Sequence, residues 1–473
     1  NVMYVEQLFT ACLAEMAYYI ESNGEAAIID PLRETAPYIE LAKKRGAKIN
    51  YVFLTHFHAD FVSGHVDLAR KTGATIVFGP HATTQFNFHS GTDGEAFKIG
   101  DISLKLIHTP GHTMESSSYL LIDEQGNTPF IFTGDCLFIG DVGRPDLAVK
   151  SDLTETDLAK HLFDSLRNKI MTLPNDIIIY PAHGAGSSCG KNMSSETFDT
   201  LGNQKETNYA LRADMTKEEF VEEVTAGLST PPQYFPKNVG MNKGINKDYD
   251  TILNEANKPL SISEFETLAA APNVLIIDVR HENDFVKGFI KGALFFGLDG
   301  SFAPWVGTLI EDLNTPILLV CPEGRELETI TRLSRVGYDN VQGYLKGGYQ
   351  SWKDAQKETD HIESITPKNF AENHYPNNIA IIDVRKDTEY ISEHIEHQNV
   401  ANLPLADVMT NHSEIKPSEK SYIHCRGGYR SVIYSSFLKQ KGFKNPINIA
   451  GGFEEIKTQK NIKLTAFVCP STL

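Results

Sequence analysis

A short segment rich in metal-binding side chains follows an apolar run early in the chain. His56, His58 and Asp60 stand two residues apart, directly after the run Tyr51–Leu54. In an extended loop that leaves a strand, alternate side chains point to the same side, so these three groups can converge. Imidazole nitrogens and carboxylate oxygens are the ligands that a borderline divalent metal prefers. The segment therefore predicts a metal site.

Three later apolar runs end in the same way, and the residues that follow them are His112, Asp135 and His183. Any one of these residues could be an ordinary hydrogen-bonded turn residue. Four strand ends that each deliver a His or an Asp to one edge instead favour a shared metal site. We expect a mixed α/β domain whose strands position these groups.

Short apolar runs alternate with polar, glycine-containing turns over the first half of the chain, which predicts buried strands. Examples are Ala26–Asp30, Tyr51–Leu54, Thr75–Phe78, Ile102–Ile107, Ser118–Ile122, Phe130–Thr133 and Asp176–Tyr180. Leucine and isoleucine recur every four residues over 158–170, which predicts an amphipathic helix after Thr154. A helical, charged stretch then ends at the proline-rich segment Ser229–Pro236, so we place the first domain boundary between there and Pro259.

The H-x-H-x-D loop, the G-H-T and G-D motifs and the late His resemble the metallo-β-lactamase superfamily. The resemblance covers about residues 1–240 and implies an αββα sandwich with a metal site between two sheets. One position departs, because the family's last His of the first motif is Phe61 here. In the dinuclear hydrolases of the superfamily, such as glyoxalase II, that His helps to hold the second metal. An apolar ring cannot coordinate, so we expect one metal.

A lone metal held by two His and one carboxylate suits non-heme Fe(II) and O₂. The persulfide dioxygenases of the superfamily use such a site, and their iron ligands, carried over by motif, fall on His56, His112 and Asp135. The resemblance leaves three residues to orient these ligands or to move protons, namely His58, Asp60 and His183. Whether His58 contacts the metal stays open.

Two residues near these motifs have both a functional and a structural interpretation. Arg144, in a G-R-P-D segment that also matches the persulfide dioxygenases, could bind an anionic group of the thiol substrate or form a structural salt bridge. Cys189 lies in a Gly- and Ser-rich loop after His183 and could be a buried apolar residue. Because that loop resembles the one in persulfide dioxygenases fused to rhodanese domains, we favour a role for Cys189 in handling sulfane sulfur. Cys136 is expected to pack.

The second half of the chain contains an internal repeat. The segment I-I-D-V-R, a Cys after an apolar run and a Gly-Gly pair each recur after 104 or 105 residues, as Ile276–Arg280 and Ile381–Arg385, Cys321 and Cys425, Gly347-Gly348 and Gly451-Gly452. Three anchors at nearly the same offset predict two copies of one α/β domain.

The second copy, residues 363–473, carries the loop C-R-G-G-Y-R-S from Cys425 to Ser431, followed by an apolar helical stretch. Backbone N–H groups at a helix N-terminus, with Arg426 and Arg430, would stabilise a thiolate and an anion held over it. The loop resembles the active loop of rhodanese sulfurtransferases. This resemblance implies that Cys425 is a nucleophile that becomes a persulfide.

The first copy, residues 259–358, reads C-P-E-G-R-E at the same place. Pro322 removes an N–H donor, and Glu326 occupies the position of Arg430. A carboxylate there would raise the pKa of Cys321 and repel sulfite or persulfide. We expect this copy to be inactive and to serve as a spacer or docking module. The neighbouring Arg325 leaves the reactivity of Cys321 open.

The composition narrows the partners and the compartment. With 44 Lys and Arg against 61 Asp and Glu, the net charge of −17 argues against nucleic acid and against anionic membranes as partners. No apolar run approaches the roughly 18 residues that span a bilayer, and the first residues show no export signal. Six scattered cysteines favour a reducing compartment, so we expect a cytoplasmic protein. The chain starts at Asn1, so an earlier leader stays open.

Together these features predict a persulfide dioxygenase domain (residues 1–240), a linker (241–258) and two rhodanese-like α/β domains. A mononuclear non-heme Fe(II) would use O₂ to oxidise a low-molecular-weight thiol persulfide to sulfite and thiol, and Cys425 would pass sulfane sulfur to sulfite to give thiosulfate. The physiological sense would be the detoxification of sulfide and persulfide. The carrier thiol (glutathione, coenzyme A or a similar thiol), the direction of sulfur flow and assembly into a homo-oligomer stay open.

Two alternatives belong to other functional classes. The first is a glyoxalase-II-like zinc thioesterase with accessory rhodanese domains, which the loss of a ligand at Phe61 disfavours. The second is a sulfur-carrier or persulfide-sensing scaffold with a vestigial metal site, which the near-complete ligand set disfavours.

Overall fold

The computed structural model describes residues 2–470, which form two compact units. The first unit comprises the residues up to Asp250 together with Ser334–Gly337. The second comprises Thr251–Leu333 and the residues from Tyr338 onward.

The first unit contains two six-stranded sheets. In the first sheet the order is β1-β2-β3-β4-β5-β6, antiparallel up to β3 and parallel beyond it. Its strands are β1 Tyr4–Thr10, β2 Glu15–Ser22, β3 Glu25–Ile29, β4 Lys48–Phe53, β5 Thr75–Phe78 and β6 His89–Ser90. In the second sheet the order is β12-β11-β10-β9-β8-β7. Its strands are β7 Ala96–Ile99, β8 Ile102–His108, β9 Ser117–Ile122, β10 Phe130–Gly134, β11 Ile178–Pro181 and β12 Asp199–Thr200.

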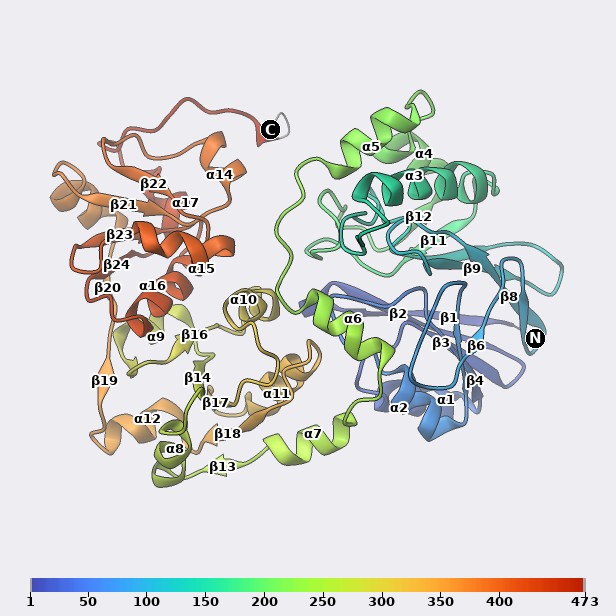
Figure 1. Cartoon of the computed structure of the whole chain (residues 1–473), viewed down its shortest axis with the longest axis horizontal. Coiled ribbons are helices and arrows are strands. Elements are labelled where there is room, and N and C mark those ends of the chain that lie inside the picture. Colours follow the sequence, from blue (N-terminus) through green and yellow to red (C-terminus); the bar gives the residue numbers. More distant parts are fainter. Residues whose placement is uncertain (1, 471–473) are drawn as a thin grey trace. The chain divides into compact units, whose positions relative to one another are not determined.

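Helices cover the outer faces of both sheets. α1 and α2 lie on the first sheet, and α3, α4 and α5 lie on the second (Figure 1). The helices of this part of the chain are η1 Ala11–Leu13, α1 Ala36–Arg45, α2 His65–Thr72, α3 Glu155–Ser165, the π-helix η2 Leu166–Ile170, α4 Leu201–Thr207, η3 Tyr209–Leu211, α5 Lys217–Thr225, α6 Phe235–Lys243 and α7 Tyr249–Ala256. The two sheets enclose an apolar core that includes Met16, Tyr18, Phe53, Leu104 and Phe132. This is the expected αββα sandwich.

The second unit contains two five-stranded sheets in which every strand pair is parallel. The first has the order β13-β18-β17-β14-β16, with β13 Pro259–Leu260, β14 Leu275–Asp278, β16 Leu294–Phe295, β17 Ile317–Val320 and β18 Val341–Leu345. The second has the order β20-β24-β23-β21-β22, with β20 Glu363–Ile365, β21 Ala380–Asp383, β22 Val400–Asn402, β23 Ser421–His424 and β24 Pro446–Ile449. A separate pair joins β15 Phe289–Ile290 and β19 Thr359–Asp360.

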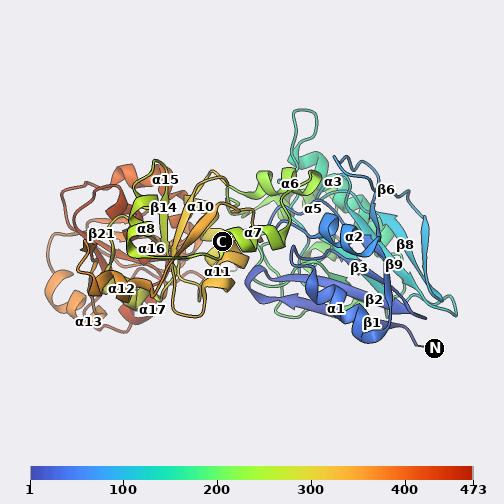
Figure 2. The same ribbon diagram turned by 90° about the horizontal axis from the view of Figure 1, so that it is seen from below.

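Helices accompany the strands of both sheets, as Figure 2 shows for β14 and β21. They are α8 Ile262–Ala269, α9 Glu282–Lys287, α10 Phe302–Leu309, α11 Glu326–Ser334, α12 Gly348–Asp354, α13 Pro367–Asn369, the π-helix η4 Phe370–His374, α14 Asp387–Ser392, η5 Leu405–Asp407, α15 Val408–Asn411, η6 His412–Glu414, α16 Arg430–Gln440 and α17 Gly452–Ile456. Because helices cover both faces of a parallel sheet, its central strands are buried on both sides, as the continuous apolar run of β17 shows.

The internal repeat is visible in matching ion pairs. At the end of β14, Arg280 Nη2 lies 2.8 Å from Asp278 Oδ2, and the same nitrogen donates to the Gly288 carbonyl. At the end of β21, Arg385 Nη2 lies 2.8 Å from Asp383 Oδ2 and donates to the carbonyl oxygen of Glu393. The I-I-D-V-R anchors thus occupy the same structural position in the two copies.

Most of the predicted strands of the first half appear within one or two residues of their expected bounds. The helix expected after Thr154 begins there, where the Thr154 hydroxyl accepts from the Asp157 N–H. β1 and β2 were not among the predicted strands, although β2 contains the apolar run Met16–Ile20 and is buried along its whole length. The segment expected to be a linker contains the end of α6 and all of α7. None of the helices in residues 2–470 combines the length and apolar character that crossing a bilayer requires.

Candidate functional site

Three side chains from three strand ends meet at one edge of the sandwich. His56 follows β4, His112 follows β8 and Asp135 follows β10. The Nε2 atoms of His56 and His112 lie 3.5 and 3.2 Å from Asp135 Oδ2. All three side chains are buried, and one ligand atom of each lies within 4.8 Å of the others. The structure thus brings the three predicted ligand residues together around one carboxylate oxygen.

A hydrogen-bond chain sets which nitrogen of His56 faces Asp135. The Thr55 hydroxyl donates to Asp30 Oδ2 over 2.7 Å, so its oxygen accepts from His56 Nδ1 at 2.9 Å. This pattern assigns the proton of a neutral His56 ring to Nδ1. His56 Nε2 is then left with a lone pair that points toward Asp135.

The backbone of Arg144 does the same for His112. The Arg144 carbonyl oxygen, which can only accept, lies 2.8 Å from His112 Nδ1. Burial lowers the pKa of His112 to about 4, in spite of the nearby Asp135 carboxylate. His112 is therefore neutral near pH 7, and its Nε2 also turns a lone pair toward Asp135.

The negative charge of Asp135, at the centre of this group, favours the binding of a cation. Burial acts against a charge on Asp135, but the histidines around it outweigh burial and hold its pKa well below the usual range. Burial is likewise outweighed at His56, whose pKa Asp135 raises. Neither Asp135 Oδ2 nor His56 Nε2 has a hydrogen-bond partner among the described residues. A buried carboxylate oxygen that faces imidazole lone pairs is costly unless positive charge lies between them, so this donor set fits a divalent metal.

The residues expected to assist the ligands form a second buried group, His58, Asp60 and His183. His183 Nδ1 contacts Asp135 Oδ1 at 2.7 Å, and its Nε2 lies 2.6 Å from Asp60 Oδ2. Burial opposes a charge on His183, but Asp135 and Asp60 together raise its pKa well above the usual value. His58 Nε2 lies 3.0 Å from Asp30 Oδ1. The second group therefore joins the first through Asp135 and Asp30.

Phe61 occupies the position where the superfamily motif carries its last His. The ring is fully buried, and its centroid lies 4.5 Å from that of His58. The second group consequently receives no ligand atom from this position, although its own three members could hold an ion.

The two interpretations of Arg144 can be compared with its contacts. The guanidinium donates to both carboxylate oxygens of Asp146 at 2.7 and 2.8 Å and to the carbonyls of Ser188 and Ser229. The residue is 3% exposed. With these donors engaged by the protein, the contacts favour the structural salt bridge over substrate binding, and the residue serves the site through its carbonyl at His112.

Cys189 is buried against the metal residues. Its sulfur belongs to a group with Asp135 and His183 in which the potential ligand atoms lie within 4.8 Å of one another. Burial first, and then the carboxylates of Asp60 and Asp135, raise the pKa of Cys189 well above the usual value. The thiol thus reaches the site but is held in its neutral form. Cys136 packs in the apolar core beneath α3, as expected.

A cavity of about 230 Å³ opens beside His112. Apolar side chains, among them Phe57 and Val239, form part of its wall, and two lysines, Lys150 and Lys243, line it together with one carboxylate, Glu115. His112 itself lines this cavity, so the cavity reaches the metal residues. The cavity could therefore admit a molecule that combines an apolar part with charged groups to the metal site.

Supporting residues from distant parts of the chain escaped the sequence reasoning. Asn242, on α6, donates to the carbonyls of His58 and Phe61, both at 2.9 Å, and accepts from the Ser63 N–H at 2.9 Å. Asp30, at the end of β3, directs His56 through Thr55. No local pattern marks Asn242 as a partner of a loop about 180 residues earlier, whereas an Asp at a strand end could have been noticed as part of the same edge.

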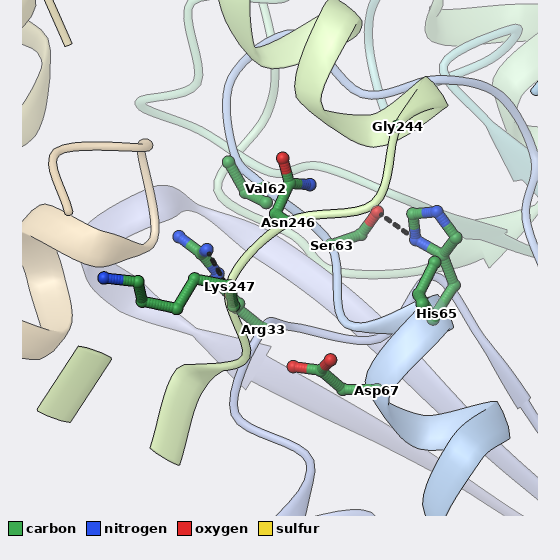
Figure 3. Close-up of a pocket in the computed structure, with 9 residues that line it drawn as sticks. Arg33, Val62, Ser63, His65, Asp67, Gly244, Asn246 and Lys247 are labelled. Carbon is green, nitrogen blue, oxygen red and sulfur yellow. Dashed lines mark hydrogen bonds between the residues drawn. The ribbon is translucent and has the colours of Figure 1, made fainter. Parts of the chain in front are cut away.

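Figure 3 shows a smaller pocket, of about 20 Å³, behind the motif loop. His65 lies there with Nδ1 2.9 Å from Ser63 Oγ and Nε2 3.0 Å from the Asn242 carbonyl oxygen. Burial lowers the pKa of His65 to about 4. A neutral histidine with both nitrogens engaged is a packing residue, so this pocket does not extend the metal site.

The second unit presents Cys425 at the end of β23, before α16. The Gly428 N–H donates to Cys425 Sγ over 3.1 Å, and Ser431 Oγ lies 3.6 Å from the sulfur. Gly428 has φ +102°, a conformation that favours glycine. A side chain at Gly452 would come within 2.6 Å of the Cys425 carbonyl oxygen, which explains the second glycine of the Gly-Gly anchor.

The two arginines of this loop are paired with carboxylates. Arg426 is largely exposed and contacts Glu454 at 2.8 Å. Arg430, the first residue of α16, forms two hydrogen bonds to Glu389 at 2.8 and 3.1 Å. The loop therefore places its backbone, rather than either guanidinium, in direct contact with the sulfur.

The first copy keeps the cysteine in a different setting. Cys321 Sγ contacts Thr329 Oγ1 at 3.7 Å, and among residues 2–470 no backbone N–H donates to this sulfur. Burial, aided by Glu326, raises the pKa of Cys321 to about 12. Arg325 pairs with Asp299 and Glu328.

Comparison with known proteins agrees with this organisation. Residues 11–183 match the metallo-beta-lactamase superfamily, and residues 261–355 and 366–459 each match the rhodanese-like domain. The chain is 34% identical to the human mitochondrial persulfide dioxygenase ETHE1 over 184 residues, which are 38% of this chain and 67% of that protein. It is 30% identical to a hydroxyacylglutathione hydrolase of Tolumonas auensis over 170 residues, 35% of this chain and 60% of that enzyme.

A solved structure extends the similarity. A crystal structure described as a metallo-beta-lactamase from Staphylococcus aureus subsp. aureus COL aligns with a TM-score of 0.65 at 30% identity, over 73% of this chain and 99% of that one. The chain spans 59 to 67% of the length of the persulfide dioxygenases that it matches. It therefore belongs to the metallo-β-lactamase superfamily, has persulfide dioxygenases among its relatives, and carries two rhodanese-like domains after the metallo-β-lactamase fold.

Proposed function

We propose that the protein oxidises a low-molecular-weight thiol persulfide with O₂ and handles the sulfane sulfur at Cys425. The first reaction would be R–S–SH + O₂ + H₂O → R–SH + SO₃²⁻ + 2 H⁺. The observation that carries this proposal is the buried convergence of His56, His112 and Asp135 around one unpartnered carboxylate oxygen. Its likeness to a persulfide dioxygenase and the rhodanese-like domains support it.

His56, His112 and Asp135 would hold one Fe(II) ion, since two imidazoles and a carboxylate with open positions suit this metal. When bound, iron would supply the electrons that make O₂ reactive toward sulfur. The chain's own residues would do the rest. Thr55 and the Arg144 carbonyl would keep the two imidazoles in the ligating tautomer, and His183 is placed to hold or pass a proton between Asp135 and Asp60.

The cavity beside His112 would receive the carrier thiol. Its apolar wall suits an alkyl or amide chain, and Lys150 and Lys243 suit carboxylate or phosphate groups on that chain. Glutathione and coenzyme A both meet this description, so the proposed substrate is an anionic thiol persulfide.

Cys425 would carry sulfane sulfur as a persulfide. Transfer to sulfite would follow Cys425–S–S⁻ + SO₃²⁻ → Cys425–S⁻ + S₂O₃²⁻, in which one S–S bond breaks and another forms without an external electron donor. The reverse exchange would load Cys425 from thiosulfate. Gly428 would stabilise the thiolate through its N–H, while Arg426 and Arg430 would attract the sulfite or thiosulfate anion.

We assign the proposed activities to segments of the chain. Residues 1–240 would form the dioxygenase domain, 241–258 the linker, 259–358 the inactive rhodanese copy and 363–473 the active copy. Cys189 would receive or present sulfane sulfur next to the metal, in keeping with the position of its sulfur near Asp135 and His183. A cytoplasmic location and a role in sulfide detoxification complete the proposal.

Metal content and oxygen uptake of protein purified without air would test the dioxygenase. We expect about one iron per chain, O₂ consumption on glutathione persulfide, and sulfite as product. Asp135→Ala should abolish O₂ consumption and leave cyanide-dependent sulfur transfer by Cys425 intact, whereas Cys425→Ser should do the converse. Two ions bound side by side at full occupancy, or survival of both activities in both variants, would contradict the assignments.

A zinc thioesterase is the second candidate function. It is favoured by the second group, His58, Asp60 and His183, and by the similarity to hydroxyacylglutathione hydrolase. In that case the protein would contain zinc, cleave a glutathione thioester and consume no oxygen.

A further inference from the structure

One side chain of the Cys425 loop, that of Tyr429, contacts the other rhodanese copy. Tyr429, in the middle of that loop, donates its hydroxyl to the Gly297 carbonyl of the first rhodanese copy over 2.5 Å. Its ring meets Phe295 edge-on, with centroids 5.6 Å apart. Both partners lie at the end of β16, and both copies belong to the same compact unit.

Two glycines of the first copy leave room for this ring. A side chain at Gly300 would begin 2.3 Å from Tyr429 Cζ, and one at Gly297 would begin 3.1 Å from Tyr429 Cε2. Neither glycine has a positive φ, so the backbone itself does not require glycine at these positions. At Gly300 the missing side chain is explained by the Tyr429 ring alone, whereas at Gly297 the ring of Phe295, 2.8 Å away, and the Arg280 carbonyl oxygen also leave no room for one.

Tyr429 directly follows Gly428, the residue whose N–H contacts the sulfur of Cys425. Gly428 aims its N–H at Cys425 Sγ from a backbone with φ +102°. Glycine is the most conformationally free residue, so this orientation depends on what fixes its neighbours. Tyr429 fixes one side of Gly428, and a rotation there would turn the N–H away from the sulfur.

A second hydrogen bond joins the same two rhodanese copies. The Phe295 N–H donates to Ser436 Oγ on α16 over 3.0 Å, and α16 packs against β16. The first copy therefore touches both the loop and the helix that follows it.

Among the described residues, the first copy has no residue equivalent to Tyr429 that contacts the second copy. At the position of Tyr429 the first copy has Arg325, which pairs with Asp299 and Glu328 of its own domain. By strand register, the second copy has Pro404 and Asp407 at the positions of Gly297 and Gly300, so neither position is a glycine there. One copy thus provides the slot and the other the side chain that enters it.

We infer that the first rhodanese copy, through Gly297 and Gly300, clamps Tyr429 and so keeps the Gly428 N–H directed at Cys425, which makes Tyr429 a positioning residue for sulfur transfer. The inference rests on the proposed sulfur transfer by Cys425. It gives a defined task to a domain whose own cysteine is predicted to be inactive.

Tyr429→Phe would test the hydroxyl contact in the full-length protein, with thiosulfate and cyanide as substrates. One hydrogen bond is lost, so we expect kcat to fall about three- to tenfold with little change in the KM for thiosulfate, and Cys425 to be alkylated more slowly at neutral pH. The matched control is Tyr338→Phe, which removes a hydroxyl bond of the same 2.5 Å length to the Ile310 carbonyl within the first copy. The control should lower thermal stability comparably and leave kcat and alkylation unchanged.

Gly300→Ala would test the slot from the other domain. We expect a loss of kcat similar to that of Tyr429→Phe, while Ser301→Ala, at an exposed neighbour in the same loop, has no effect. In a Tyr429→Ala background Gly300→Ala should cost nothing further, because the ring that it displaces is gone. Losses that simply multiply, or a wild-type kcat and alkylation rate in both Tyr429→Phe and Gly300→Ala, would overturn the clamp. A different outcome would overturn the proposed function and leave the clamp standing. In that outcome the wild-type protein shows no sulfur transfer, but Cys425 is still alkylated more slowly in the Tyr429→Phe and Gly300→Ala variants than in the wild type.

Discussion

The two rhodanese copies have the same fold but surround their cysteines with different groups. Both place an Asp–Arg pair at the end of the strand next to the central one, and both keep a Gly-Gly pair behind the loop. Only Cys425 receives a backbone N–H, whereas Cys321 lies among carboxylates that add to the effect of burial. The comparison teaches that the framework of a domain can persist while its chemistry is decided by a few loop residues.

The comparison would be broken most directly by exchanging each cysteine for serine. Cys425→Ser should reduce cyanide-dependent sulfur transfer by at least about a hundredfold, because serine forms no persulfide. Cys321→Ser should leave the rate unchanged. Sulfur transfer that falls with Cys321→Ser would show that the first copy reacts.

The buried ion pairs should differ in strength between the copies. Burial raises the pKa of Asp278 in spite of Arg280, whereas at Asp383 the effect of burial is outweighed by His424 and Arg385, which lower its pKa. Asp383→Asn should therefore cost about 3 kcal/mol of unfolding free energy at pH 7, and Asp278→Asn clearly less.

Acid should reduce the difference in unfolding free energy between the wild-type protein and Asp383→Asn. A lowered folded pKa means that the stabilisation by Asp383 is present above the unfolded value and is lost as the pH falls through the folded value. Urea titrations at pH 7 and below about pH 4 should show the gap between wild type and Asp383→Asn shrinking. A gap that is constant with pH would contradict the ionised state of Asp383.

The conformation of the loop glycine provides a matched pair of variants. Gly428 and Gly324 occupy the same loop position and have φ values of +102° and +89°. Alanine at either should cost about 1–2 kcal/mol of stability, because a left-handed backbone disfavours a side chain. Only Gly428→Ala should also reduce sulfur transfer, by about tenfold, since it disturbs the N–H at Cys425. Equal sulfur-transfer activity of Gly428→Ala and Gly324→Ala would show that catalysis does not depend on the Gly428 N–H.

The smallest expected effect concerns the charge next to Cys321. With a pKa of about 12, its thiolate fraction and its alkylation rate should rise about tenfold per pH unit over the neutral and alkaline range. Glu326→Arg replaces a carboxylate by a cation, lowers that pKa and should raise the alkylation rate at pH 8 about three- to tenfold. Glu326→Gln should give an intermediate rate. A rate that is insensitive to both variants would leave burial as the sole cause of the low reactivity.

Much of this organisation could be predicted from the sequence because it is encoded locally. The repeat anchors, the Cys425 loop and the His and Asp residues after apolar runs are short patterns, and strand ends at one sheet edge bring such groups together. The predicted residues His56, His112 and Asp135 do lie within reach of one ion. The iron itself and the reaction remain proposals.

The supporting contacts could not be predicted, because their partners are distant in sequence. Nothing near Tyr429 indicates that Gly297 accepts its hydroxyl, and nothing near Arg144 indicates that its donors are taken by Asp146, Ser188 and Ser229. These features depend on tertiary packing rather than on local pattern.

The contact of Asn242 with the motif loop also sets an order of events during synthesis. The carbonyl of His58 receives its hydrogen bond from a residue 184 positions later in the chain. At the pace of a ribosome, roughly ten to forty seconds separate the emergence of these two residues. A nascent chain therefore carries its histidine loop without this support until α6 has left the exit tunnel, and only then can the loop adopt its final backbone conformation.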